Sequence, residues 1–589
     1  MKTARWNLSR LYDPKDAYRS IEKDLEIIRK SFEGFRVKYE NDAARFADPV
    51  FLSEALGDYE RLYTTLPLTR AVNYFNYRKD LDVKDTQAHA RFNLVLARLE
   101  NLFNGVRFFE TVVAKIPSEH RARILSDKNI SKYKYFLENL FLQGKHTLTL
   151  PEEKILAIKK IPGYQMWING AEKAINALSV KYGKRELSLT QALSLCPTLG
   201  TSPRRKLYDE VLKKLSDNAL FAENEINAII TDRKLNDDLR HFKNPYDQTL
   251  LEYKISAETV TALRNAVADN LRLSHRFYKA KAKMLGLAKL RYADRNAKAG
   301  KINKKYGWDK ARQIVGDVFR GFHPSLAFFV GGYVNGGQID AHSRVGKTGG
   351  AYCSGNINAP TFVLLNHADT FDSVMTFAHE MGHALHTDLS KGHSNALYRE
   401  YSYPAAETAS AFFEGLVFDK VTKDLKGQDR MIALHDSISD FTQTVFRQMA
   451  CFNFELELHN EIRAKGELTK EGMAALMNKH MKEYLGPVFD LRPLDGYFFV
   501  GWPHIRRYFY VVSYVFGELV SRAMLSMLKK DKNFASEVFK FLRAGGENTT
   551  EEIFRGIGID VKDPGFWQEG FDSVAAEIEE LELLIRDEI

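Results

Sequence analysis

Residues 371–389, with the sequence FDSVMTFAHEMGHALHTDL, contain the pattern HExxH at His379, Glu380 and His383. This pattern fits an α-helix, because residues four apart lie one turn above each other and two imidazoles can then bind one metal ion. Glu380, about 100° around the helix from His379, can reach a water molecule bound to that ion. Apolar residues recur along the segment at helical spacing, which predicts burial. The stretch therefore predicts a buried helix that carries a metal site.

A metal-dependent hydrolase also needs a third protein ligand and an open position for water. The extended pattern HExxHxxGxxH would supply a third histidine, but this chain has His386 and Leu389 where that pattern has Gly and His. Glu407 and Glu414 instead lie seven residues apart in ETASAFFE, on one face of a second predicted helix. Both could be solvated surface acids, but the surrounding alanines and phenylalanines predict a buried helix, where acids need a partner. We predict Glu407 as the third ligand and Glu414 as the acceptor for the free N–H of a ligating histidine.

The whole chain has the length and composition of a large folded protein. Its 589 residues exceed what one core usually holds, which predicts two or more lobes. The net charge of +9 comes from dispersed basic residues accompanied by acids, so we expect no nucleic-acid partner. The three cysteines are widely spaced, which argues against a disulfide framework and against a cysteine-based zinc site.

The sequence shows neither a membrane span nor a secretion signal. No apolar run approaches the ~20 residues needed to cross a bilayer. The first residues, MKTARWNLSRLYDP, lack the apolar core of a signal peptide. We therefore expect a cytoplasmic location and no membrane partner.

The pattern of the chain changes twice along its length. Amphipathic helical patterns follow one another over residues 13–186, and the turn-rich residues 197–203 form the clearest break. We expect an N-terminal helical lobe at residues 1–195 and a catalytic lobe that carries the metal site at residues 196–589. Within the second lobe, residues 321–366 consist of short β-like runs separated by glycines, which predicts a small sheet directly before the metal helix.

The predicted sheet includes a strand at residues 328–330, with the glycines of residues 331–337 in hairpin turns. Another strand directly precedes the metal helix, and a strand with a free edge can hold an extended peptide through its backbone. A buried strand explains the same residues equally well. The candidate substrate-binding residues are the five of this strand: Thr361, Phe362, Val363, Leu364 and Leu365.

An aromatic segment late in the chain contains His504, Tyr508, Tyr510 and Tyr514. Hydrolysis of an amide builds negative charge on the carbonyl oxygen, and a Tyr O–H or a His N–H can share that charge with a metal ion. Aromatic residues at helical spacing usually belong to a core. The residues alone therefore favour a core role over a catalytic one.

Several motifs in this chain resemble the oligoendopeptidase F branch of the thimet-oligopeptidase-like metallopeptidases. They are, in order and at similar intervals, GKTGGAYCSG, PTFVLLN, FAHEMGHALH, ETASAFFE and the late His504 with its tyrosines. The motifs cover roughly residues 345–515, and the N-terminal helical lobe and the overall length are also similar. The resemblance implies a mostly α-helical fold, with two helical lobes around a deep substrate channel and a small β-sheet next to the HExxH helix.

The same resemblance implies one Zn²⁺ per chain, bound by His379, His383 and Glu407. It also implies Glu380 as the general base and short peptides, rather than folded proteins, as substrates. We therefore expect a zinc-dependent endopeptidase that hydrolyses internal peptide bonds of short unstructured oligopeptides. In this mechanism Glu380 takes a proton from zinc-bound water and later passes it to the leaving amine.

The resemblance implies that His504, Tyr510 and Tyr514 stabilise the transition state. An Arg-Arg pair at residues 506–507 stands where the family usually has aromatic residues. Which tyrosine does the work is therefore open, and Tyr508 is the alternative.

Two other functions stay open at this point. An exopeptidase of the same zinc class, such as a dipeptidyl carboxypeptidase, would need a fixed cation to bind a terminal carboxylate, and Arg506 and Arg507 could supply it. A peptide-binding protein that has lost catalysis would not need a base, and the intact Glu380 argues against it.

Overall fold

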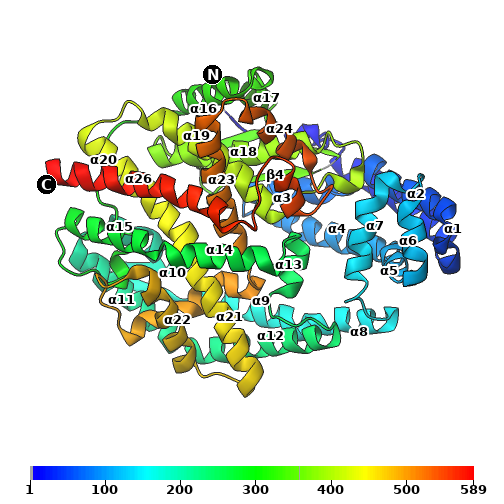
Figure 1. Ribbon diagram of the computed structural model, residues 1–589, viewed down its shortest axis with the longest axis horizontal. Helices are drawn as coiled ribbons and strands as arrows, with labels where there is room; N and C mark the ends of the chain where they lie inside the picture. Colours follow the sequence, from blue (N-terminus) through cyan, green and yellow to red (C-terminus); the bar gives the residue numbers. More distant parts are fainter. Residues whose placement is uncertain (1–3, 357, 589) are drawn as a thin grey trace. The chain divides into compact units, whose positions relative to one another are not determined.

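The computed structural model describes residues 4–356 and 358–588, and the chain is mostly helical with two small sheets (Figure 1). It divides into two compact units, each assembled from three separate stretches of sequence. The first unit comprises residues 1–147, 304–421 and 527–559. The second unit comprises residues 148–303, 422–526 and 560–589. The expected fold class, mostly α-helical with a small sheet beside the HExxH helix, is confirmed.

The first unit contains an N-terminal group of helices, a three-stranded sheet and the helices that carry the metal site. Its helices are α1 (Ala17–Tyr39), α2 (Pro49–Thr65), α3 (Arg70–Leu81), α4 (Thr86–Asn104), α5 (Phe108–Ala114), α6 (Ser118–Ser126), α7 (Lys134–Gln143), α16 (Trp308–Phe322), α17 (Phe329–Asn335), α18 (Phe371–Ser390), α19 (Tyr403–Thr422), α24 (Phe534–Ala544) and α25 (Thr550–Arg555). Its strands are β3 (Ile339–His342), β4 (Tyr352–Asn356) and β5 (Ala359–His367).

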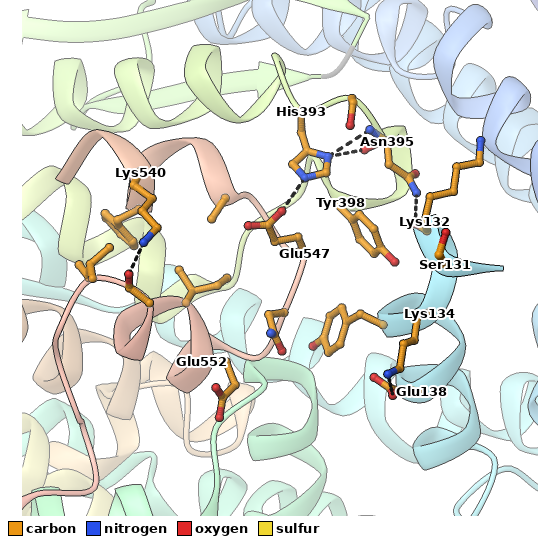
Figure 2. Close-up of a pocket in the computed structure, with 18 residues that line it drawn as sticks. Ser131, Lys132, Lys134, Glu138, His393, Asn395, Tyr398, Lys540, Glu547 and Glu552 are labelled. Atoms are coloured by element: carbon orange, nitrogen blue, oxygen red, sulfur yellow. Dashed lines mark hydrogen bonds and ion pairs between the residues drawn. The ribbon is translucent and has the colours of Figure 1, made fainter. Parts of the chain in front are cut away.

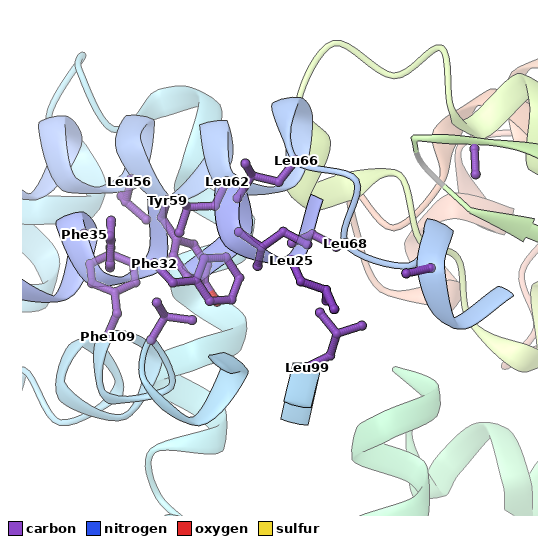
Figure 3. Packing of buried hydrophobic residues seen from close by; sticks show 14 of the residues in the cluster. Leu25, Phe32, Phe35, Leu56, Tyr59, Leu62, Leu66, Leu68, Leu99 and Phe109 are labelled. Carbon is purple, nitrogen blue, oxygen red and sulfur yellow. The ribbon is translucent and has the colours of Figure 1, made fainter. Parts of the chain in front are cut away.

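The N-terminal helices of this unit pack around a large aromatic core (Figure 3). Helix α1 contributes buried residues at spacings of three and four, among them Leu25, Phe32 and Phe35. The Phe35 ring lies 5.6 Å from the ring of Tyr59 and 5.4 Å from that of Phe109. Each such buried side chain stabilises the fold by about 1.5–3 kcal/mol relative to an exposed one. The helical periodicity of the sequence therefore corresponds to the buried face of a real helix.

The same core reaches the sheet through Phe362 and Leu364 of β5. The Trp6 indole N–H donates a hydrogen bond to the Val363 carbonyl at 2.9 Å, and its ring lies 5.7 Å from that of Phe362. The Tyr77 ring lies 5.1 Å from Phe362 on the same side. These contacts hold one face of the sheet against the N-terminal helices.

The sheet has three strands in the order β3-β5-β4. The central strand β5 pairs in parallel with β3 and antiparallel with β4, so Val363 has Ile339 on one side and Cys353 on the other. The prediction of a free edge at residues 361–365 is therefore wrong, because a neighbouring strand already occupies each side of that segment. Local sequence pattern does not reveal which strand is central, since pairing joins residues far apart in the chain.

The two outer strands differ in how their edges are covered. On β3, the Ala341 N–H donates to the carbonyl of Ala4 at 3.1 Å, so N-terminal residues cover that edge. Among the described residues, no strand pairs with the outer side of β4. The free edge of this sheet therefore belongs to β4.

The prediction of a strand at residues 328–330 is also wrong, as is the assignment of the following glycines to hairpin turns. Helix α17 occupies this position, with Gly331 and Gly332 inside it. Val330 and Tyr333 are buried three residues apart, a spacing that fits one face of a helix. A short apolar run does not distinguish a strand from a buried helix by periodicity alone.

The second unit is helical apart from one hairpin, formed by β1 (Ser179–Tyr182) and β2 (Arg185–Ser188). Its helices are α8 (Leu150–Lys160), α9 (Met166–Asn176), α10 (Leu189–Leu195), α11 (Thr201–Asp217), α12 (Ala219–Leu239), α13 (Asp247–Tyr253), α14 (Ala257–Asp269), α15 (Leu271–Met284), α20 (Gly427–Phe441), α21 (Gln448–Lys465), α22 (Lys470–Leu485), α23 (Val512–Lys530) and α26 (Pro564–Glu588). The turn-rich residues 197–203 lie inside this unit, and a lobe boundary near residue 195 stays a prediction.

In the part of the chain that the structure describes, no helix has the length and apolar character needed to cross a membrane.

Candidate active site

Helix α18 carries the two histidines of the HExxH pattern. Thr370 caps its N-terminus, since the Thr370 hydroxyl oxygen accepts a hydrogen bond from the Ser373 N–H at 3.2 Å. Most of the helix is buried against neighbouring elements, but His379 and His383 remain partly exposed. The centres of their rings lie 4.9 Å apart. The helix therefore presents two imidazoles, one turn apart, at a position that a ligand can reach.

Helix α19 crosses α18 in direct contact at Gly382, the glycine within HEMGH. A Cβ atom at this glycine would lie 2.7 Å from the Cα atom of Ser410 and 3.0 Å from the carbonyl oxygen of Ala409. Glycine permits this approach because it has no side chain. The contact lies between Glu407 and Glu414 on α19, so the close crossing brings both carboxylates to the histidines.

The ligand atoms of His379, His383 and Glu407 all lie within 4.8 Å of one another. The Nε2 atom of His379 lies 4.0 Å from Oε2 of Glu407. On the other side of the same ring, Nδ1 lies 2.9 Å from Oε2 of Glu414. A hydrogen on Nδ1 that bonds to Glu414 leaves the lone pair of Nε2 directed away from it, as a metal ligand requires. The three residues therefore form a group that could hold one metal ion.

The electrostatics of the group favour a cation. Burial raises the pKa of Glu380 to about 7 and also raises the pKa of Glu407. Burial lowers the pKa of His383 well below its usual range. It also acts to lower the pKa of His379, but the hydrogen bond and charge of Glu414 outweigh it and raise that pKa to about 9. In the described residues, no lysine or arginine pairs with these carboxylates, so a metal ion would balance their charge.

Glu380 is linked to the free strand of the sheet. Its carboxylate accepts a hydrogen bond from the backbone N–H of Cys353 in β4. Its Oε2 atom is buried and has no hydrogen-bond partner. The motif GKTGGAYCSG includes Cys353, but a residue pattern does not reveal that its backbone N–H faces Glu380. The contact nevertheless places the free edge of β4 beside Glu380.

The late aromatic group belongs to the second unit. The ring of His504 lies 5.9 Å from that of Tyr510 and 5.8 Å from that of Tyr514. The two tyrosine rings lie 5.2 Å apart. Burial, with nearby Arg447 and Arg507, lowers the pKa of His504 to about 4. The imidazole is therefore neutral at physiological pH and can donate one N–H.

The backbone that leads into Tyr510 is strained. Tyr508 and Phe509 have φ angles of 34° and 58°, in the left-handed region that non-glycine residues rarely adopt. The Phe509 N–H donates to Glu455 Oε1 at 2.8 Å, and the Tyr508 carbonyl accepts from Thr249 Oγ1 at 2.9 Å. Neither Glu455 nor Thr249 stands out in the sequence, since each is near Tyr510 only through the fold.

The hydroxyl of Tyr508 is already engaged in the fold. It donates to the Ile229 carbonyl at 2.9 Å, which makes Tyr508 a structural residue. Arg506 is likewise engaged, because its guanidinium donates to the buried carboxylate of Glu225 at 2.6 and 2.7 Å. Arg506 therefore cannot serve as a free cation for a substrate carboxylate. Arg507 is exposed and lies over Tyr510.

Comparison with known proteins finds two family models that match parts of this chain. The model of peptidase family M3 matches residues 323–573, and the Oligopeptidase F model matches residues 113–169. Group B oligopeptidase PepB of Streptococcus agalactiae is 23% identical over 535 residues, which cover 88% of each chain. The oligoendopeptidase F homolog of Lactococcus lactis subsp. lactis is 22% identical over 599 residues, covering 98% of this chain and 97% of the relative.

Solved structures show the same fold. A crystal structure from Chlamydophila abortus has a TM-score of 0.85 at 22% identity and covers 99% of this chain and 98% of its own. The crystal structure of oligoendopeptidase-F from Enterococcus faecium has a TM-score of 0.70 at 17% identity, with 98% and 99% covered. Residues 323–573 of this chain therefore match peptidase family M3, and the relatives that align with almost its whole length include oligoendopeptidase F homologs.

Proposed function

We propose that this peptidase is a zinc-dependent endopeptidase that hydrolyses internal bonds of short, unstructured oligopeptides. The main support is the convergence of His379, His383 and Glu407, whose ligand atoms lie within 4.8 Å of one another. Two imidazoles and one carboxylate with an open position are a common ligand set of catalytic zinc. Glu414 supports the same proposal because its hydrogen bond to His379 Nδ1 leaves Nε2 for the ion.

In the proposed mechanism, Glu380 is the general base and later the general acid. When bound, zinc supplies a Lewis acid that polarises the scissile carbonyl and lowers the pKa of its water. Glu380 accepts the proton that the water loses and donates it to the leaving amine. The hydrogen bond from the Cys353 N–H orients the carboxylate, and its unpartnered Oε2 is available for the proton.

The outer edge of β4 is our proposed docking strand for the substrate. A peptide added to this edge would be held in extended form by backbone hydrogen bonds. The contact between Glu380 and Cys353 places the general base beside the same edge. Residues 361–365, in the central strand, would then support β4 rather than bind the peptide.

His504, Tyr510 and Tyr514 are our proposed stabilisers of the oxyanion, in line with the family resemblance. The neutral imidazole of His504 and a tyrosine hydroxyl are both hydrogen-bond donors suited to developing negative charge. Tyr508 is not among the proposed stabilisers, because its hydroxyl donates to the Ile229 carbonyl.

An exopeptidase is the weaker alternative. Its terminal-carboxylate site would need Arg506 or Arg507, and Arg506 is buried in an ion pair with Glu225. A binding protein without catalysis is weaker still, because Glu380 is intact and buried beside the metal group. The endopeptidase assignment therefore has the best support.

The length of the substrate should limit cleavage. The deep channel implied by the resemblance would admit a short flexible peptide and exclude a folded protein. A nested series of unstructured peptides would share one cleavage site and extend from about five residues, the length of a short strand, to a whole denatured protein. We expect turnover, followed by mass spectrometry, to fall as length grows. Digestion of a denatured casein-like chain as fast as the short peptides would replace this assignment with a general protease.

Glu414 should tune metal affinity without being a ligand. Glu414→Ala removes the acceptor for His379 Nδ1, and loss of such a partner typically weakens metal binding by about 10- to 100-fold. Glu414→Gln keeps an acceptor oxygen and should lose less. Competition with a graded chelator would give both affinities. Equal affinity of the alanine variant and the unchanged protein would contradict this role.

A further inference from the structure

The strained turn, residues 506–509 of the second unit, depends on side chains for part of its backbone hydrogen bonding. Tyr508 and Phe509 have positive φ angles in succession, a conformation that persists only where the surrounding structure enforces it. The Tyr508 carbonyl accepts a hydrogen bond from Thr249 Oγ1 at 2.9 Å, and the Phe509 N–H donates to Glu455 Oε1 at 2.8 Å. Both residues lie between a 3₁₀-helix and the start of α23, so no regular element supplies these bonds.

The turn is also anchored at its first residue. The Arg506 carbonyl accepts a hydrogen bond from the Tyr164 hydroxyl, and the Arg506 guanidinium donates to Glu225. A cavity of about 420 Å³ lies beside the turn, with Tyr164, Thr249 and Tyr508 in its wall. Packing therefore does not hold the turn on this side, and the hydrogen bonds fix its position instead.

Glu455 differs from the other anchors because it is a fully buried acid. Its exposed fraction is 0%, and among the described residues its Oε2 atom has no hydrogen-bond partner. Burial raises its pKa to about 8, although the Phe509 N–H and the charge of Arg233 act to lower it. The carboxyl is therefore mostly neutral at physiological pH. A neutral carboxyl still offers an acceptor oxygen to the turn, without leaving an unbalanced charge in the core.

The groups around Glu455 would balance a negative charge only in part. The titratable and charged side chains there come from α12, η4 (Ile161–Gln165), the turn and α21 itself, and they are Arg233, Tyr164, Tyr508, Cys451 and His459. Burial raises the pKa of the two tyrosines and the cysteine and lowers that of the histidine, so these four are neutral at physiological pH. Arg233 is the one cation among the five, and its Nε already lies 3.2 Å from Oδ1 of Asp237.

A loop beside the cavity of about 590 Å³ in the first unit has similar side-chain support without strain (Figure 2). His393 Nδ1 accepts a hydrogen bond from the Asn395 N–H at 3.1 Å, and its Nε2 lies 2.9 Å from Oε2 of Glu547. Asn395 also donates to the Lys132 carbonyl at 2.8 Å. No residue from 393 to 398 has a positive φ angle. The turn at residues 508–509, in contrast, would relax to an ordinary conformation once its anchors were lost.

We propose that Glu455 is a positioning residue for the late aromatic group, which holds the strained turn, and thereby Tyr510, through the Phe509 N–H. This inference rests on the proposed function, in which Tyr510 stabilises the oxyanion. Glu455 would act through the backbone, without contact with the reacting atoms. Tyr510 directly follows Phe509, so a change in the turn moves its hydroxyl. A displacement of about 1 Å at a catalytic group can lower the rate by about a hundredfold.

Three variants test this role by kinetics. Glu455→Leu removes the acceptor for the Phe509 N–H and should lower kcat by about tenfold to a hundredfold, with little change in KM. Glu455→Gln keeps an acceptor oxygen and should keep normal kcat at neutral pH. Glu457→Leu is the matched control on the same helix, because it loses contacts to Lys479 and His480 but none to the turn. Normal kcat of Glu455→Leu, shown by melting curves to be folded, would overturn the proposal.

The dependence of kcat on pH is a second readout. The neutral carboxyl of Glu455 becomes charged as pH rises through its pKa of about 8. A buried charge with incomplete balance favours conformations that admit water, so the turn should loosen and kcat should fall over this range. Glu455→Gln cannot ionise and should lose less activity there. An identical alkaline fall in the two proteins would exclude the neutral carboxyl as the positioning form.

Hydrogen exchange at the Phe509 amide separates this inference from the proposed function, because it requires no peptide cleavage. Glu455→Leu should speed this exchange by about tenfold, whereas Glu455→Gln should leave it near normal. Trypsin should also cut faster after the exposed Arg507 in the leucine variant. Unchanged exchange and cutting would overturn the support of the turn by Glu455. Faster exchange together with normal kcat would instead exclude the turn, and Tyr510 with it, from catalysis.

Discussion

Glu380→Gln is expected to lower the rate of peptide hydrolysis by about 10³-fold or more while leaving the fold and the metal content unchanged. The glutamine keeps the shape of the side chain and can still accept the hydrogen bond from the Cys353 N–H. It cannot take a proton from water or return one to the leaving amine. Glu380 is not a member of the group of three ligands, so the metal should remain bound.

The measurement is single-turnover cleavage of a defined peptide, with metal content determined on the same preparation. Glu400→Gln makes the same chemical change at an exposed residue between α18 and α19, and it should keep normal activity. A Glu380→Gln enzyme that works within tenfold of the unchanged protein would exclude Glu380 as the general base.

Glu407→Ala is expected to lose most of its zinc at chelator concentrations that leave the unchanged protein loaded. Two imidazoles on one helix do not complete a catalytic site, which normally has three protein ligands. The loss of metal should also abolish peptide hydrolysis. Glu407→Gln keeps an oxygen in place without the negative charge, so we expect an intermediate affinity.

Zinc content after dialysis against graded chelator would rank the three proteins. Thermal melting would establish that the alanine variant is folded, since an unfolded protein would lose zinc for another reason. Full zinc retention by folded Glu407→Ala would mean that another residue is the third ligand.

The spacing of the site residues can be predicted from the sequence because it follows from helix geometry. Residues four apart meet on one helix face, so the HExxH spacing alone places His379 and His383 together. Glu407 and Glu414 lie on one helix face for the same reason, because seven residues make about two helical turns. The contact between the two helices cannot be predicted in this way, because it joins Gly382 to residues almost thirty positions later.

The sheet illustrates the limit of local patterns. The sequence is compatible with either a free edge or a buried strand at residues 361–365, and in the structure strands β3 and β4 flank them on both sides. Alternation and β-branching favour a strand without indicating its neighbours. The glycine-rich run at α17 is ambiguous for another reason, since a short apolar segment satisfies both periodicities.

The surroundings of the late aromatic group depend on contacts across long stretches of sequence. Arg506 pairs with Glu225, which lies 281 residues earlier in the chain. Glu455, 54 residues before Phe509, holds the backbone of the strained turn. A sequence pattern identifies the tyrosines, but it does not show which hydroxyl group is already hydrogen-bonded to a distant part of the chain. The hydroxyl of Tyr508 is an example.

Gly382 occupies one of the two positions that the HExxH pattern leaves unspecified. The structure nevertheless restricts which residue can stand there. Even a methyl group at this residue would press on the backbone of α19 and displace Glu407 and Glu414 relative to the histidines. Natural selection for metal binding would therefore preserve this glycine, although it touches neither metal nor substrate. Met381, its neighbour, is also fully buried, so a large change of size there would cost packing in the core. In a library of random substitutions, the glycine should be nearly as invariant as the ligands themselves.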